Sequence, residues 1–146
     1  MAAGSHPRDF IMIDHQAALI YTMVLVSAAD RNMSDAELRI IGDNVRDLPA
    51  FAGYDHGKLT ETLGECAALL AGENGLEEIL KKIKSALPSR LRETAYALAC
   101  DVAAADSEAS QEELRVLELI RDRLKIDRLV AAAIERGTRA RFTTAS

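Results

Sequence analysis

The sequence predicts an all-α fold, with about seven helices packed into one compact bundle of two similar halves. No window of the chain alternates apolar and polar residues over the length of a strand, whereas apolar residues recur at steps of three and four. Glycine and proline fall between these periodic stretches, where they separate helices. With 146 residues, of which 49% are hydrophobic and 28% charged, the composition is that of a single soluble domain.

The helix boundaries follow from the residues that interrupt helices. Pro49 and Gly53 separate the second helix from the third, and Gly72 and Gly75 separate the third from the fourth. Pro88 opens the fifth helix, where its missing N–H has little consequence. The expected helices cover residues 14–30, 34–48, 57–72, 75–87, 89–106, 110–124 and 127–139.

The apolar pattern divides these helices into central and covering ones. Residues 75–87 and 110–124 carry one apolar stripe each, which is typical of a helix that packs on a core with one face. Residues 14–30 and 89–106 are apolar nearly all round, so we expect them at the centre of the bundle. The expected organisation is an N-terminal extension over residues 1–13, a single helical domain over 14–139 and a frayed C-terminal tail over 140–146.

Composition and motifs exclude several classes of function. The net charge of -5 and the absence of Trp argue against nucleic-acid binding. The longest apolar run covers residues 17–29, shorter than the roughly 20 residues of a membrane span. No signal-peptide pattern is present, and Cys66 and Cys100 are expected as buried free thiols, so we expect a cytoplasmic protein. Motifs for catalysis or phosphate binding are missing, so we expect no enzyme, no catalytic residue and no organic cofactor.

One motif occurs twice. The chain reads AADRNMSDAEL from residue 28 and AADSEASQEEL from residue 104. Over residues 28–41 (the first motif) and 104–117 (the second motif), an offset of 76 matches seven of the fourteen positions. This agreement predicts an internal duplication, with a pseudo-two-fold axis and the two central helices packed at that axis.

Each motif contains a capping box. Ser34 with Glu37, and Ser110 with Glu113, have the spacing in which the hydroxyl caps the helix and the glutamate returns to the N–H of the serine. Each cap is worth about 1 kcal/mol. Capping alone is therefore one complete explanation of the repeated serine and glutamate.

Capping does not explain the repeated aspartate. Asp30 and Asp106 end apolar helices, where the helix dipole disfavours a carboxylate by roughly 0.3–1 kcal/mol. The start of the next helix could compensate, which leaves two solvated caps. Alternatively, the two halves meet and four carboxylates converge on a divalent cation, with Ca²⁺ or Mg²⁺ favoured over Zn²⁺ or Mn²⁺ because all ligands are oxygen. The candidate ligands are Asp30, Glu37, Asp106 and Glu113.

Four converging carboxylates need compensation. Raised pKa values, a basic partner such as Arg39 or Arg115, or a bound cation would each supply it. An EF-hand is excluded, because its sixth position would be Asp35 or Gln111 in place of glycine. Its last position would be apolar in both motifs.

The paired Ala-Ala-Asp-x-x-x-Ser-x-x-Glu-Leu pattern resembles the TerB-like domain of tellurite-resistance proteins, over roughly residues 14–139. It is also similar to the N-terminal region of some membrane-anchored J-domain co-chaperones. The resemblance implies an all-helical fold with two pseudo-symmetric halves, whose acidic residues are suspected ligands of a divalent cation. It further implies a cytosolic stress protein, associated with tellurite resistance, that acts with protein partners at the inner membrane face.

The chain departs from this family at one position of the motif. The family usually has glycine after the aspartate, and here Arg31 and Ser107 take that place, where a left-handed turn costs energy. Asn32 and Glu108 could add oxygen ligands, whereas Asp101 is expected to pair with an arginine or lysine.

Two hypotheses on function follow, with a third in reserve. The first is a non-enzymatic protein that binds a divalent cation and acts with partner proteins, as a monomer or weak dimer. The second is a metal-free helical interaction module akin to the co-chaperone region, for which an exposed apolar groove would be the sign. A metal-assisted hydrolase is the third, and it requires a pocket beside an open metal position.

Overall fold

The computed structural model describes residues 12–106 and 108–146. Over these residues the chain forms seven α-helices, three short 3-10 helices and no strand, which confirms the predicted all-α fold. The α-helices are α1 (His15–Ser27), α2 (Asp35–Asp47), α3 (Leu59–Leu70), α4 (Gly75–Ala86), α5 (Arg92–Ala104), α6 (Gln111–Arg123) and α7 (Arg128–Phe142). The 3-10 helices are η2 (Pro49–Phe51), η3 (His56–Lys58) and η4 (Ser89–Leu91).

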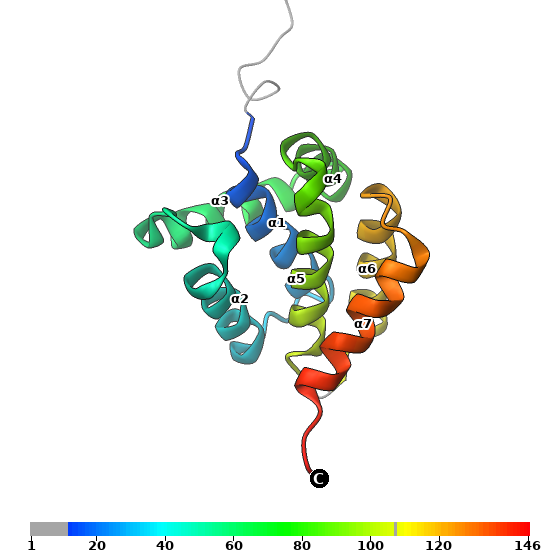
Figure 1. Ribbon diagram of the computed structural model, residues 1–146. Coiled ribbons are helices and arrows are strands. Elements are labelled where there is room, and N and C mark those ends of the chain that lie inside the picture. Colours follow the sequence, from blue (N-terminus) through cyan, green and yellow to red (C-terminus); the bar gives the residue numbers. More distant parts are fainter. Residues whose placement is uncertain (1–11, 107) are drawn as a thin grey trace, which may run out of the picture.

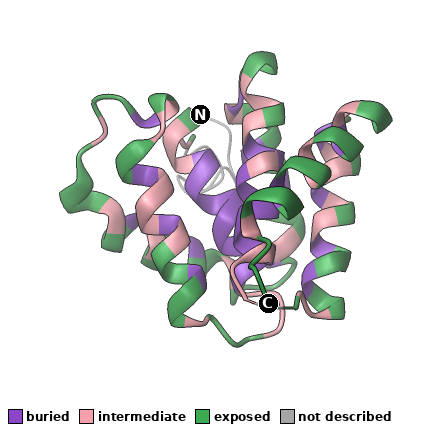
Figure 2. Ribbon diagram, turned by 60° about the horizontal axis from the view of Figure 1, so that its bottom comes forward, coloured by how far each residue is buried: buried purple, intermediate pink, exposed green. Residues whose placement is uncertain are grey.

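The centre of the bundle is formed by α1 and α5, which lie side by side (Figure 1). Every residue from Ala18 to Ser27 of α1 is buried, and α5 is buried along most of its length. Figure 2 shows this buried centre surrounded by helices with one exposed face. This burial confirms the prediction that the two apolar helices lie at the centre. A helix without a polar face is stable only when other helices surround it.

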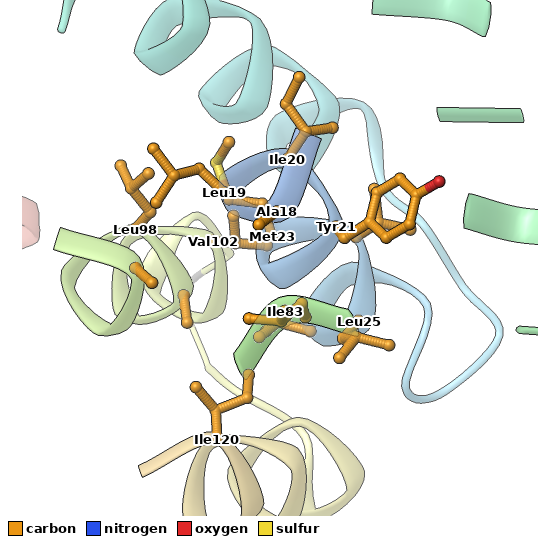
Figure 3. Packing of buried hydrophobic residues seen from close by; sticks show 14 of the residues in the cluster. Ala18, Leu19, Ile20, Tyr21, Met23, Leu25, Ile83, Leu98, Val102 and Ile120 are labelled. Carbon is orange, nitrogen blue, oxygen red and sulfur yellow. The ribbon is translucent and has the colours of Figure 1, made fainter. Parts of the chain in front are cut away.

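The remaining helices cover this centre from different sides. Helices α3 and α4 pack on α1, α7 packs on α5, and α2 and α6 each contact both central helices. Figure 3 shows α4 and α6 contributing Ile83 and Ile120 to the same cluster as Leu19, Leu98 and Val102 from the centre. One continuous core therefore joins the N-terminal and C-terminal parts of the chain.

Three helix ends differ from the prediction by three residues. Helix α1 ends at Ser27 and not at residue 30, so Asp30 lies in the turn after the helix. The fifth helix is preceded by the 3-10 turn η4, so regular α-helix begins at Arg92 and not at residue 89. Helix α7 continues three residues past the predicted end at 139, to Phe142. The positive charges of Arg139 and Arg141 in its last turn stabilise the negative end of the helix dipole. The Thr143 hydroxyl also donates a hydrogen bond to the carbonyl of Arg139, at 2.6 Å. Part of the predicted tail is thus helical, while residues 1–11 of the predicted N-terminal extension lie outside the described residues.

Both cysteines are free and buried, as the sequence predicts. Burial raises the pKa of the Cys66 thiol to about 12, and the Cys100 thiol is raised to a similar value mainly by burial. Such thiols are protonated at neutral pH and unreactive. None of the helices in the described part of the chain is long and apolar enough to cross a membrane.

Candidate functional site

The two motifs fold alike at the start of α2 and α6. Ser34 Oγ accepts from the N–H of Glu37 at 3.1 Å, and the N–H of Ser34 donates to Glu37 Oε1 at 3.0 Å. The equivalent bonds join Ser110 and Glu113 at 3.1 and 2.9 Å. Both predicted capping boxes are therefore confirmed. Because each glutamate folds back over its helix start, its carboxyl group is carried into the protein interior.

The two capping glutamates meet inside the molecule. Glu37 is 1% exposed and Glu113 2% exposed, and their carboxyl groups lie within hydrogen-bonding reach of one another. Burial, and next the neighbouring Glu113 carboxyl, raises the pKa of Glu37 to about 7. Two adjacent buried carboxylates repel one another, so Glu37 holds a proton below about pH 7.

The two glutamates differ in their remaining partners. Glu37 Oε1 accepts a second hydrogen bond from the hydroxyl of Ser27, at 3.0 Å. Glu113 Oε2 is buried without a hydrogen-bond partner among the described residues. A proton on Glu37 supplies the donor that this oxygen lacks, because a protonated carboxyl group donates one hydrogen bond.

Asp106 is the second contact between the motifs. The hydroxyl of Ser34 donates to its carboxylate, 3.1 Å from Oδ1 and 3.2 Å from Oδ2. Asp106 therefore lies at the N-terminus of α2, where the helix dipole favours a negative charge. This contact explains why a carboxylate is tolerated at the end of α5: the compensating helix start belongs to the other motif, 72 residues away in sequence.

Asp30 does not take the equivalent place. Its Oδ1 accepts from the N–H of Asn32 at 3.0 Å, which closes a turn within its own loop. Among the described residues it has no hydrogen bond to the second motif. The structure thus joins Glu37 and Glu113 directly, links Asp106 to them through Ser34, and leaves Asp30 apart. No three His, Cys, Asp or Glu side chains of the described part of the chain are grouped so that they could hold a metal ion. Cation binding by the four predicted ligands stays a prediction.

The structure also places the basic and acidic residues that the sequence singles out around the motifs. Asp101 is buried and pairs with Arg141, Oδ1 to Nη2 2.6 Å, as the sequence predicts. Arg31 does adopt the left-handed conformation, with φ 61°, whereas Ser107 lies outside the described residues. Arg39 and Arg115 are exposed and neutralise neither buried glutamate.

Ser27 also belongs to the buried cluster around Glu37, although the sequence did not single it out. It is fully buried at the last position of α1 and donates to Glu37. The residue at the matching position of the second copy, 76 residues later, is Ala103. A serine that ends a largely apolar helix, seven residues before the cap serine Ser34, is the signal that could have indicated this contact.

A groove opens beside the first motif, between the C-terminal half of α1, the start of α2 and α3. It has a volume of about 1030 Å³. Met33 and Leu38 line it and are exposed large apolar side chains, at 37% and 40%. Arg31 is the one charged residue among those that line it. The other lining residues are Val24, Leu25, Ala28, Ala29, Leu63, Gly64, Ala67, Leu70, Ala71, Gly72, Leu76 and Val116.

The second motif faces a different kind of cleft. Leu114, which matches Leu38 at the offset of 76, lines a cleft between α6 and α7. That cleft also contains arginine and glutamate side chains, among them Arg121 and Glu135. The two motifs therefore share their capping geometry while the surfaces beside them are apolar in one case and charged in the other.

Comparison with known proteins identifies the family of the chain. Neither a curated protein nor a solved structure matches it. A protein-family model described as "Tellurite resistance protein TerB" matches residues 16–136, from the second residue of α1 into α7, and this range contains both motifs. With this match over most of its length, and with the all-helical fold and paired capping boxes described above, the chain belongs to the TerB family.

Proposed function

We propose that this TerB-family protein is a non-enzymatic helical module that binds a protein partner through the groove between α1, α2 and α3. The observation that carries the proposal is the apolar lining of that groove, with Met33 and Leu38 exposed at its edge. Contiguous apolar surface of this kind is typical of interaction sites, because exposing it to water is unfavourable. The cytoplasm, and protein partners at the inner membrane face during stress such as tellurite exposure, are the setting that the family favours.

The interior contacts support a binding module more than a catalyst. The repeated serine and glutamate are used for helix capping and for holding the two motifs together. Both capping glutamates are buried, so they are not presented to a substrate. The proposal accordingly includes no chemical step.

The test is site-specific crosslinking in cells of the native host under stress, with a photoreactive residue at Leu38. Leu114 is the matched control, because it has the same place in the other motif and is 45% exposed. We expect a discrete crosslinked partner from position 38 and none from position 114. Equal adducts from both positions, or none from position 38, would overturn the proposal.

Binding of a divalent cation is the second candidate function. The observation that favours it is the unpaired, buried Oε2 of Glu113 beside Glu37, since such an oxygen is stabilised by any positive charge. Glu37 and Glu113 would hold the ion, with Asp106 nearby behind Ser34. Ca²⁺ or Mg²⁺ is expected before Zn²⁺ or Mn²⁺, and binding would displace the proton on Glu37 and so strengthen as the pH rises.

Thermal unfolding with each of the four ions tests this second candidate. An ion at 100 times its dissociation constant adds about 2.7 kcal/mol to the free energy of unfolding. The gain should be larger at pH 8 than at pH 6 and should disappear in Glu113→Gln. A double variant, Asp30→Asn with Asp106→Asn, asks whether the aspartates contribute. An absence of any ion-dependent shift would remove cation binding and leave the interaction module unaffected.

A further inference from the structure

We infer that the groove between α1, α2 and α3 receives an amphipathic helix of a partner protein, which packs apolar side chains on α3 and places a carboxylate against Arg31. The inference rests on the proposed function and adds the chemistry of the partner.

The floor of the groove fits a helix. Gly64 and Ala67 of α3, and Ala71 directly after its last residue, are three and four residues apart, and all three line the groove. Small side chains at this spacing let the backbone of a second helix approach closely, near the lower end of the usual 8–10 Å between packed helix axes. Only Thr62 and Cys66 of α3 are buried, although most of this helix is apolar. Helix α3 therefore keeps an apolar face that no other described helix covers.

The walls of the groove fit apolar side chains of that helix. Leu63 and Leu76 lie on the side of α3 and α4, and Met33 and Leu38 lie on the side of α2. A methionine wall adapts to different apolar side chains, since its thioether chain is flexible. The volume of about 1030 Å³ is at the upper end of pockets for small molecules, and it suits several side chains on successive helix turns.

The positive charge of Arg31 in the groove favours a partner that carries a negative charge. Arg31 is the one charged lining residue, and among the described residues it has no ion pair and no side-chain hydrogen bond. By contrast, Arg46, Arg123 and Arg141 each pair with a carboxylate within 3 Å. An arginine at the edge of an apolar surface gains most from a carboxylate that arrives together with apolar side chains, because the contact then excludes water. The partner helix is therefore expected to carry an Asp or Glu beside its apolar stripe.

Binding of synthetic peptides to the purified full-length protein tests the inference. The probe is an 18-residue helical peptide with a Leu/Ala stripe and one central Glu, and matched peptides carry Gln or Lys in its place. Isothermal titration calorimetry gives the affinity for wild type, Arg31→Glu, Leu38→Asp and the control Leu114→Asp. Circular dichroism confirms that each variant is folded.

The expected pattern is specific. Wild type should bind the Glu peptide about tenfold more tightly than the Lys peptide, a typical effect of one partly desolvated charge pair. Arg31→Glu should reverse this preference, Leu38→Asp should abolish binding, and Leu114→Asp should bind like wild type. Equal binding of the Glu and Lys peptides would overturn the acidic partner while leaving the groove as a docking site. Binding of no peptide would overturn both. Self-association of wild type that Leu38→Asp abolishes would identify a second copy as the occupant and overturn the inference.

Discussion

The two motifs have the same local fold and different surroundings. In both, serine caps a helix and glutamate returns to the N–H of the serine at about the same distances. Among the residues that the structure describes, only the first motif has a buried hydroxyl, from Ser27, on its glutamate, and only its cap serine donates to the aspartate of the other motif. The repeated residues therefore determine the helix starts and also supply the contacts that join the motifs, whereas Ser27, outside the repeat, and the different contacts of Asp30 and Asp106 make the two motifs unequal.

The glutamate pair is where this asymmetry has the largest expected effect. The pKa of Glu37 is about 7 in the folded protein against 4.5 without the fold, so the folded state holds the proton more tightly between these two values. The contribution of Glu37 to the free energy of unfolding should therefore be fully present below about pH 4.5 and be lost as the pH rises to about 7. At about 1.4 kcal/mol per pKa unit the loss is about 3 kcal/mol.

Replacing Glu37 by glutamine tests this pH dependence. The amide stays neutral and can still donate to Glu113, so Glu37→Gln should remove the slope and exceed wild type by about 3 kcal/mol at pH 8. Urea unfolding at pH 5, 6, 7 and 8 measures both effects. Glu118→Gln, at an exposed position of the same helix as Glu113, is the control. Parallel pH profiles for wild type and Glu37→Gln would contradict the proton on Glu37.

The two cap serines should differ next. Ser34→Ala removes a cap and also the donor to Asp106, whereas Ser110→Ala removes a cap only. We expect losses of about 2 kcal/mol for the first and about 1 kcal/mol for the second, since a hydrogen bond to a carboxylate adds to the cap. Chemical denaturation of both variants gives the difference, and in an Asp106→Asn background it should shrink. Equal losses would mean that the contact between the motifs contributes no stability.

The two central helices also differ at one pair of matched positions before the motifs. At the offset of 76, α1 has Leu25 where α5 has Asp101. Asp101 is buried and its partner Arg141 is largely exposed, so Arg141→Ala leaves a carboxylate without its cation. We expect a loss of about 1 kcal/mol, reduced from the value for a buried pair because water reaches the arginine. Asp101→Leu should be close to neutral in thermal unfolding, and the same loss in both variants would argue against this account.

Sequence reasoning predicted the local features of this protein well. The helices, the two central ones among them, follow from periodicity, and both capping boxes follow from the spacing of Ser34, Glu37, Ser110 and Glu113. These features depend on residues within about one helix turn, so no knowledge of the distant chain is needed.

The contacts between the motifs could not be predicted in the same way. The partner of Asp106 is Ser34, and this pairing depends on the relative position of α2 and α5, which a few ångströms of shift would change. The hypothesis of four converging carboxylates treated the motifs as equivalent, although Asp30 accepts from Asn32 of its own loop and Asp106 accepts from Ser34 of the other motif. The groove could not be predicted from the sequence either, because its apolar lining comes from several helices and each of them separately has an ordinary apolar pattern.

The smallest expected effect concerns the turn after α1, where stability and binding oppose one another. Arg31 has φ 61°, a conformation that costs a residue with a side chain about 1–2 kcal/mol. Glycine would avoid this cost, but it also loses more conformational freedom on folding, which offsets part of the gain in stability. Arg31→Gly should therefore raise the free energy of unfolding by about 0.5 kcal/mol, whereas Arg46→Gly, within α2, should lower it by about 1 kcal/mol. The same Arg31→Gly protein should bind the Glu and Lys peptides equally, because the groove then carries no charge. A gain in stability together with lost discrimination would mean that the arginine is kept for binding at the expense of the turn. If Arg31→Gly is instead less stable than wild type, the left-handed turn is not strained, and binding is no longer needed to explain the departure from glycine at this position.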